Sequence, residues 1–589
     1  MQKINTQTIS MTRYRSPVRG GVRSSSLTPL LKPLALAMLT AFSALAPLAA
    51  SAAGPPVAPD SGSILQQLKP ALPPAPDSPA TGLTIEQQSG AALPATAAFT
   101  VKSLTLTGNT RFDSATLHAL VADAEGQTLN LSQLGQFADR ITEYYHAHHY
   151  PLARAIIPAQ SIKDGAVTIQ VLEARYGKVT LENESRVTTP LLAATLAPLK
   201  VGDVIEQTEM DHVLLLLSDI PKIAVNAVIR PGEAVGTSDL DVTTLAGPRW
   251  SGIASVDDYG NKYTGRTRGG ATVSLIDPFD HGDFLSLAGL SSGEDLNYGR
   301  LSYEATANGL GTRLGAAFSA LHYKLGAPLQ ALDGHGTAQV ASLWAKQPLI
   351  RSQNLDLYAQ VQYDHLTLHD DLDASAIKTD RHLDNGTASL TGDARDGFLA
   401  GAVSTGNVSL TYGRVDFDNG AAELADGATA RIQGSFTKFN VNLARLQKLT
   451  AADGLYLSFA GQWTSDNLDS SQKMVAGGPY TVRAYDLGAV SGDIGELGTV
   501  EFQHDLGTAW KGQWQASAFI DSEHVKVNAT PWVVGPNGAT LTGAGIGLAW
   551  AGPHQWTAKT SLAARIGAVP VLITDPSSVR WWLELNRAF

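Results

Sequence analysis

Apolar and polar residues alternate along the C-terminal part of the chain, residues 249–589. One run shows the alternation clearly. Its apolar positions are Leu355, Leu357, Ala359, Val361 and Tyr363, and the polar residues that alternate with them include Asp356, Gln360, Gln362 and Asp364. A period of two puts successive side chains on opposite faces of a β-strand. Because Gly, Asn and Asp separate such runs, the pattern predicts many antiparallel strands joined by turns.

These strands predict a closed barrel that spans a membrane. About nine to eleven residues of a tilted strand cross a bilayer. At about 21 residues per strand and connection, residues 249–589 provide roughly sixteen strands. Closure is required because an open sheet edge in lipid leaves backbone groups without partners. A soluble β-protein is the alternative, and the export signal described below weighs against it.

The last run of alternating residues predicts which side chains face lipid. The residues predicted to face the lumen are Arg580, Glu584 and Asn586. On the opposite face, Arg587 is a charged exception among apolar residues. That lipid-facing set comprises Val579, Trp581, Leu583, Leu585 and Phe589. The run therefore predicts a final membrane strand that ends in an aromatic residue.

Two consecutive units of mixed α and β pattern precede the barrel, at residues 99–175 and 176–248. In the first, a helical stripe begins after Ser132, its expected N-cap, and comprises Leu134, Phe137, Ala138, Ile141, Tyr144 and Tyr145. The second repeats the plan, with a stripe of Met210, Val213, Leu214 and Leu217. Each unit has the order β-α-α-β-β, so the sequence predicts two copies of one α+β domain.

The N-terminus reads as a removed targeting segment. Residues 1–52 contain a basic leader, an apolar stretch from Leu34 to Ala50 and a small-residue cleavage site, Ala50-Ser51-Ala52. Residues 53–98 are rich in Pro, Ala and Ser, as in a semi-extended linker. Within it, residues 61–69 form either a short amphipathic helix or a linker segment that contains three aliphatic residues.

Composition narrows the classes of function. The 44% of hydrophobic residues argues against disorder, and long apolar runs are absent after the N-terminus, which excludes a helical multispan protein. With no cysteine, neither a disulfide nor a thiolate metal site can form. The net charge of −11 gives no reason to expect nucleic acid as a partner. No phosphate loop is present, so the chain encodes no nucleotide site.

Sequence patterns that could indicate a catalytic or metal-binding site have simpler explanations here. Residues 289–293 match the pattern G-x-S-x-G, but that motif needs a strand-to-helix turn and here it leads into a hairpin loop. His365 and His369 have metal-ligand spacing only on a helix, whereas the alternation predicts a strand. We therefore expect no catalytic residue, no metal and no cofactor.

One long connection, residues 466–496, contains a conspicuous cation. Gly477 and Gly478 are followed by Arg483, and the period of two in the next strand aims Asp521 into the lumen. An exposed loop arginine contributes about 0–1 kcal/mol through an ion pair. Inside a partly dry lumen, a broken pair costs about 3–5 kcal/mol. The glycine pair and Asp521 favour the second interpretation, a structural anchor.

The same residues carry a family resemblance. Val482-Arg483-Ala484-Tyr485, followed by Phe519-Ile520-Asp521, resembles the signature of two-partner secretion translocators (TpsB). Members commonly have Gly where this chain has Ala484, a change that leaves Arg483 and Tyr485 intact. The resemblance implies an outer-membrane barrel with periplasmic POTRA domains, an Arg483–Asp521 contact inside the barrel, and a plug helix at residues 61–69. It also implies that the barrel-assembly machinery recognises Phe589.

The resemblance implies export of one large partner protein of the adhesin or cytolysin class, whose N-terminal secretion domain the POTRA domains capture. An exposed sheet edge can add an extended segment through main-chain hydrogen bonds. Two alternative functions remain possible for this sequence pattern. A barrel-assembly factor shares this plan but usually has more POTRA domains, and a passive pore or uptake receptor needs none.

Overall fold

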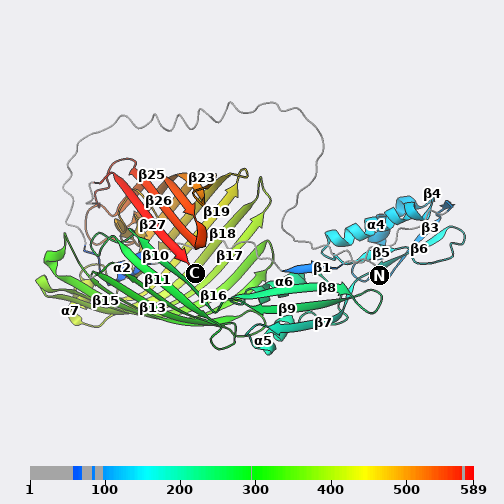
Figure 1. Ribbon diagram of the computed structural model, residues 1–589. Coiled ribbons are helices and arrows are strands. Elements are labelled where there is room, and N and C mark those ends of the chain that lie inside the picture. Colours follow the sequence, from blue (N-terminus) through cyan, green and yellow to red (C-terminus); the bar gives the residue numbers. More distant parts are fainter. Residues whose placement is uncertain (1–57, 69–81, 87–96, 294, 574–576) are drawn as a thin grey trace, which may run out of the picture.

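The computed structural model describes residues 58–68, 82–86, 97–293, 295–573 and 577–589. The expected signal peptide, residues 1–52, lies outside the described residues. The structure has a β-barrel and an elongated arm of two α+β units that extends from one end of it (Figure 1). Among the described residues, no helix has the length and apolar composition needed to cross a membrane.

The first unit packs two helices against a three-stranded sheet with the order β3-β6-β5. The expected Ser132 cap is wrong: Asn130 is the N-cap of α4, because its side chain accepts from Gln133 N while Gln133 Oε1 accepts from Asn130 N. Ser132 lies inside the first turn. The elements are β2 (Phe99–Thr100), β3 (Ser103–Thr107), α3 (Ser114–Ala119), η1 (Ala122–Ala124), β4 (Thr128–Leu129), α4 (Leu131–Ala147), β5 (Arg154–Ile156) and β6 (Ala166–Leu172).

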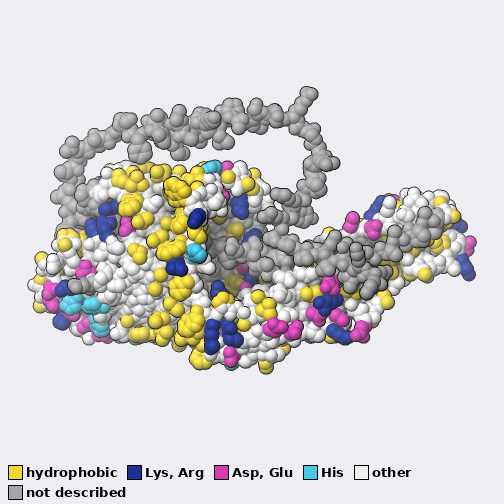
Figure 2. Space-filling model, in the orientation of Figure 1, with side chains coloured by type: hydrophobic (Ala, Val, Ile, Leu, Met, Phe, Trp, Pro, Cys, Tyr) yellow, Lys and Arg dark blue, Asp and Glu magenta, His cyan; other side chains and the backbone are white. Residues whose placement is uncertain are grey.

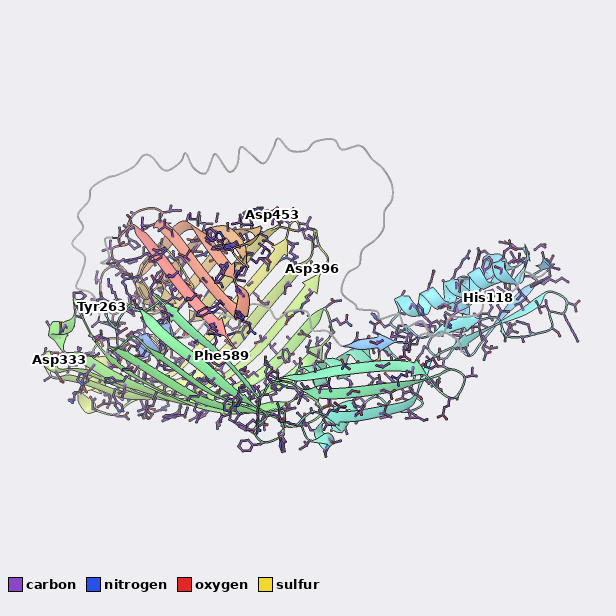
Figure 3. All side chains as sticks on the ribbon, in the orientation of Figure 1. His118, Tyr263, Asp333, Asp396, Asp453 and Phe589 are labelled. Carbon is purple, nitrogen blue, oxygen red and sulfur yellow. The ribbon has the colours of Figure 1, made fainter. Side chains whose placement is uncertain are left out.

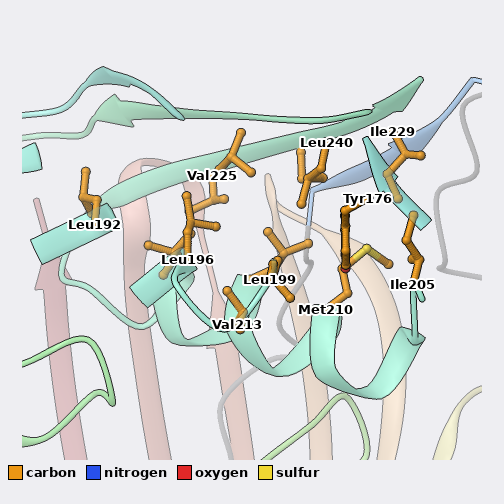
Figure 4. Close-up of a cluster of buried hydrophobic side chains, with 14 of the residues drawn as sticks. Tyr176, Leu192, Leu196, Leu199, Ile205, Met210, Val213, Val225, Ile229 and Leu240 are labelled. Carbon is orange, nitrogen blue, oxygen red and sulfur yellow. The ribbon is translucent and has the colours of Figure 1, made fainter. Parts of the chain in front are cut away.

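The second unit buries its helices against a sheet with the order β1-β8-β9-β7. Its core includes Met210, Val213 and Leu214 of the predicted stripe, together with Tyr176 (Figure 4). The linker prediction needs one correction: β1 (Leu83–Ile85) is a strand that pairs in parallel with β8. The other elements are β7 (Arg175–Glu184), α5 (Thr189–Leu196), α6 (Gln207–Ser218), β8 (Ile223–Pro231) and β9 (Thr237–Ala246).

The barrel closes through sixteen antiparallel strands, and the last pairs with the first. The fold class predicted from the alternation is therefore confirmed. The barrel strands are β10 (Trp250–Asp257), β11 (Arg268–Ile276), β12 (Phe284–Ser291), β13 (Leu296–Thr306), β14 (Arg313–Lys324), β15 (Gly334–Arg351), β16 (Leu355–Leu372), β17 (Ile377–Asp396), β18 (Ala402–Phe417), β19 (Gly434–Lys448), β20 (Asp453–Thr464), β23 (Ile494–Ala509), β24 (Gly512–Lys526), β25 (Gly538–Ala551), β26 (Trp556–Arg565) and β27 (Val579–Ala588).

Alternate residues of these strands face outward and inward. In β27 the predicted parity holds, because Trp581, Leu583 and Leu585 are exposed on the outside while Trp582 is buried. Figure 2 shows apolar side chains gathered in bands over the barrel wall. An outer surface of this kind suits contact with lipid.

The two ends of the barrel have different neighbours. Asp333, in the connection between β14 and β15, and Asp396, which ends β17, lie at opposite ends (Figure 3). The arm joins at the Asp396 end, where Arg351 at the end of β15 binds Asp219 of the second unit through Nε and Nη2, both at 2.7 Å. Asp356 of β16 accepts from Arg351 Nη1 at 2.8 Å, so a buried arginine ties the arm to the barrel rim.

Candidate functional site

The long connection between β20 and β23 folds into the barrel lumen and has structure of its own. It contains η4 (Ser470–Gln472) and the two short strands β21 (Met474–Ala476) and β22 (Val490–Gly492), which pair with each other. The turn after β21 requires glycine. Gly477 and Gly478 have φ of +86° and +128°, and a Cβ on Gly477 would lie 2.5 Å from the Asp486 carbonyl oxygen.

The structure brings Arg483 and Asp521 together. The Asp521 carboxylate accepts from Arg483 Nε and Nη2, each at 2.9 Å, and from the Arg483 backbone N at 3.2 Å. Asp521 is fully buried, and the Arg483 guanidinium lies over the Phe519 ring. A bidentate pair of this kind fixes both position and orientation.

A second carboxylate completes the arginine's surroundings. Glu501 Oε2 of β23 accepts from Arg483 Nη1 at 2.6 Å, and Thr499 of the same strand donates to Asp521 at 3.0 Å. Sequence reasoning missed Glu501. Its signal was present in the period of two, because Leu497, Thr499, Glu501 and Gln503 share the luminal face of β23.

The other predicted residues pack around this pair. Val482, Tyr485 and Phe519 belong to one buried apolar cluster between the loop and the wall. Ala484, the departure from the usual family residue, fits beside Gly543 of β25, where an added Cβ would lie 2.4 Å from that of Ala484. Trp582 Nε1 of β27 donates to the Arg483 carbonyl oxygen at 2.7 Å.

A separate acidic residue fastens the loop to another part of the wall. Asp486 accepts from Arg266 Nη2 at 2.7 Å and lies 2.8 Å from Arg580 Nη2 and 3.7 Å from Lys262 Nζ. Arg580 lies on the inward face predicted for β27. The loop is therefore held by ion pairs at two of its residues, Arg483 and Asp486.

A short helix from the N-terminal linker also lies inside the barrel. α2 (Ser61–Gln67) is capped by Asp60, and its Ile64 is buried among residues of the barrel wall, including Leu321 and Leu368. Gln67 accepts from Asn261 Nδ2 at 2.9 Å. Of the expected residues 61–69, residue 69 lies outside the described residues.

One buried arginine joins the helix, the wall and the loop. Arg381 of β17 donates to Asp60 at 2.9 Å, to Asp370 of β16 at 2.7 Å and to Asp469 at 2.5 Å. Asp370 in turn accepts from the Ser61 backbone N at 2.7 Å. The helix and the loop are thus attached to the same cation, so neither can leave unless contacts at Arg381 break.

The remaining predicted site residue lies far from this centre. Phe589 is exposed, and its backbone N donates to the Gly252 carbonyl oxygen at 2.9 Å, next to the β10–β27 seam. Within the described part of the chain, no group of three or more His, Asp or Glu is arranged to hold a metal ion. The site consists of ion pairs and packing, an arrangement that can hold a pore in a closed state.

Comparison with known proteins places this geometry in a family. Residues 99–174 match the POTRA domain of ShlB type, and residues 236–550 match the family described as haemolysin secretion/activation protein ShlB/FhaC/HecB. The chain is 28% identical over 472 residues to a heme/hemopexin transporter protein HuxB of Haemophilus influenzae, which covers 79% of this chain and 82% of that protein. It is 26% identical over 474 residues to an outer membrane transporter CdiB of Escherichia coli, which covers 77% of each.

Solved structures have the same fold. CdiB from Escherichia coli superimposes with a TM-score of 0.65 at 21% identity and covers 85% of this chain and 93% of that chain. At this identity the likeness concerns the fold. The family match covers more than half of the 589 residues. With its barrel in the outer membrane and its POTRA arm in the periplasm, this chain belongs to the haemolysin secretion/activation (ShlB/FhaC/HecB) family of outer-membrane transporters, the two-partner secretion translocators.

Proposed function

We propose that this chain exports one large partner protein, an adhesin or cytolysin, through its barrel. The observation that carries the proposal is a closed membrane barrel whose lumen holds a plug helix and an anchored loop, joined to a two-unit arm. A pore that admits an unfolded chain must be closed at rest, and these contacts supply the closure. The family to which the chain belongs supports the same function.

The arm captures the N-terminal secretion domain of the partner. An extended segment joins a sheet edge through main-chain hydrogen bonds. The sheet of the second unit already holds one segment in this way, the chain's own β1 against β8, and β7 is the strand at its opposite edge. The proposal divides the chain into five parts: a signal peptide at residues 1–52, a linker with a plug at 53–98, POTRA domains at 99–175 and 176–248, and a barrel at 249–589.

The luminal contacts define the resting state. Arg483, Asp521 and the apolar residues around them anchor the loop, and Gly477 and Gly478 permit its turn. The plug leaves through rupture of the Asp60–Arg381 pair, which frees the lumen for the partner. This step involves no enzymatic reaction, and folding of the partner outside the cell supplies direction.

Other contacts serve assembly rather than export. The outward apolar bands meet outer-membrane lipid, and the exposed Phe589 at the end of β27 serves as a recognition signal for the barrel-assembly machinery. Nucleic acid has no part in this function.

Deletion of the gene, followed by mass spectrometry of surface and secreted proteins, tests the proposal. We expect one large polypeptide to disappear from the medium and cell surface, and the wild-type chain to restore it. Reduced levels of many unrelated outer-membrane barrels would instead support an assembly factor. Unchanged secretion with loss of solute conductance would support a passive pore or uptake receptor.

A further inference from the structure

Three histidines lie on the outer wall of the barrel beyond its apolar bands. His365 and His369 are on β16, and His382 is on β17, at the end remote from the arm. Below them, Tyr363 and Tyr412 are exposed and end the apolar rows of their strands. Figure 2 shows histidine side chains gathered at this end of the barrel. The three imidazoles therefore lie in water above the membrane, on the cell-surface side.

Each of the three rings has its Nδ1 within hydrogen-bonding distance of an aspartate oxygen. His365 Nδ1 lies 2.8 Å from Asp384 Oδ1, and His382 Nδ1 lies 2.8 Å from Asp418 Oδ1. Because an ionised carboxylate only accepts, the proton is on Nδ1 in both rings. A neutral ring then has its lone pair on Nε2. Metal-binding histidines have the same arrangement, in which the second nitrogen donates to a carboxylate.

The two strands put these rings beside each other. His365 pairs with Asp384 across the β16–β17 ladder, and His382 pairs with Thr367, so the two histidines are diagonal neighbours on one face. Their ring centres are 6.0 Å apart and their planes differ by 38°. An ion bound at about 2.0 Å from one nitrogen of each ring would put the ring centres roughly 4.5–6 Å apart. The observed spacing falls at the upper end of that range.

The charge around the rings favours a cation. Asp384, Asp416 and Asp418 surround them, whereas the local cation Arg414 is already bound to Asp416 at 2.7 Å. Negative charge of this kind raises the local concentration of divalent ions.

We propose that His365 and His382 bind a divalent first-row transition-metal ion through their Nε2 atoms, with water in the other coordination positions. Imidazole nitrogen suits Cu²⁺, Ni²⁺ and Zn²⁺, and Cu²⁺ binds most tightly to such ligands. The ion links β16 to β17 where both strands project beyond the lipid. The sequence alone does not predict this site, because His365 and His382 lie on different strands and become neighbours only when those strands pair. This proposal is independent of the exported partner.

Copper titration of the full-length chain, purified in detergent without a polyhistidine tag, tests the site. We expect one tightly bound Cu²⁺ whose electron paramagnetic resonance spectrum shows coupling to two imidazole nitrogens. His365→Ala and His382→Ala should each weaken binding about tenfold or more, and Asp418→Asn should weaken it by a similar factor through loss of ring orientation.

His369→Ala is the matched control. This residue is on the same strand and face, and its Nδ1 lies 2.8 Å from Asp380 Oδ1, yet His365 is the partner in ring contact with His382. We expect the control to bind Cu²⁺ as the wild type does. Heat-modifiable migration checks that each variant is folded. Undiminished binding by the His365→Ala/His382→Ala double variant, or equal loss in the control, would overturn the proposal.

Discussion

Arg483 and Asp521 form a bidentate ion pair inside the barrel, with Nε–Oδ2 and Nη2–Oδ1 distances of 2.9 Å each. Asp521 belongs to the wall and Arg483 to a loop, separated by 38 positions in the chain. Glu501 accepts from Arg483 Nη1, the guanidinium nitrogen that Asp521 does not bind. The pair therefore fixes the loop tip to the wall through one cation and two carboxylates.

Loss of that cation should loosen the loop without unfolding the barrel. In Arg483→Ala, the buried Asp521 carboxylate is left without its charge partner, which costs about 3–5 kcal/mol. We expect partner secretion to fall strongly while heat-modifiable migration stays normal. Arg483→Lys is the control for charge alone, because lysine keeps the charge but not the bidentate geometry, and secretion should fall less. Normal secretion by Arg483→Ala would contradict the anchor.

The plug should open more often when its ion pair is removed. Asp60→Asn keeps the helix cap, since asparagine also caps well, but it removes the charge that Arg381 binds at 2.9 Å. A hydrogen bond to a charged group contributes about 1.5–3 kcal/mol, so the open fraction should rise roughly ten- to hundredfold. Single-channel recording in planar bilayers measures that fraction.

Asp60→Ala separates the two roles of the residue. It removes both the cap and the pair, so the open fraction should rise further than in Asp60→Asn. Equal conductance in wild type and both variants would mean that the Asp60–Arg381 pair does not hold the plug.

The stability of the second unit, which adjoins the barrel, should depend on pH. Burial raises the pKa of Asp211 in α6 to about 6, although Gln353 Nε2 donates to its carboxylate at 2.8 Å. The ordinary value is 3.8, so between these values the folded state binds the proton that the unfolded state releases. The free energy of unfolding of the second unit therefore falls as pH rises through this window, by at most about 3 kcal/mol, and levels off above it.

Hydrogen exchange of α6 in the full-length chain measures this dependence. We expect faster exchange at pH 7 than at pH 5, after correction for the intrinsic rate. Asp211→Asn keeps an uncharged side chain at every pH and should remove the difference. A wild-type difference that persists in Asp211→Asn would assign the pH dependence to another group.

The final strand tests the assignment of faces. Leu583 is exposed on the outer surface and Glu584 faces inward. A cation on the lipid face costs about 2–4 kcal/mol at the bilayer midplane, so Leu583→Arg should hinder insertion clearly. Glu584→Arg should insert normally, because its side chain lies on the wet side. Heat-modifiable migration and surface protease protection compare the two, and equal insertion would mean that the assigned faces are wrong.

Local patterns in the sequence predicted most of the architecture. The period of two identified the barrel strands and aimed Asp521 inward, and the helical stripes located α4 and α6. The cap of α4 was missed because Asn130 and Ser132 are both good caps, and only the reciprocal bond with Gln133 distinguishes them. Strand β1 was missed because three residues in a Pro-rich linker have no pattern of their own.

Long-range contacts explain the rest of the site. Arg381 joins Asp60, Asp370 and Asp469, which come from three distant parts of the chain. Each of these residues alone looks like a solvated charge. Their convergence depends on strand register and on the path of the loop through the lumen, neither of which a single sequence specifies. Glu501 could be predicted only in part. The period of two indicates that its side chain faces the lumen, but it does not indicate contact with Arg483.

The central claim is that a polypeptide passes through the lumen of this barrel. Adjacent residues of β17 offer a matched pair, because Ser389 faces inward and Leu390 is exposed on the outer wall. A photo-crosslinking amino acid at each position, irradiated during export, captures whatever lies next to it. We predict a crosslink to the exported partner at position 389 and none at 390. Crosslinks at 390 alone, or none at 389 while secretion proceeds, would contradict passage through the lumen.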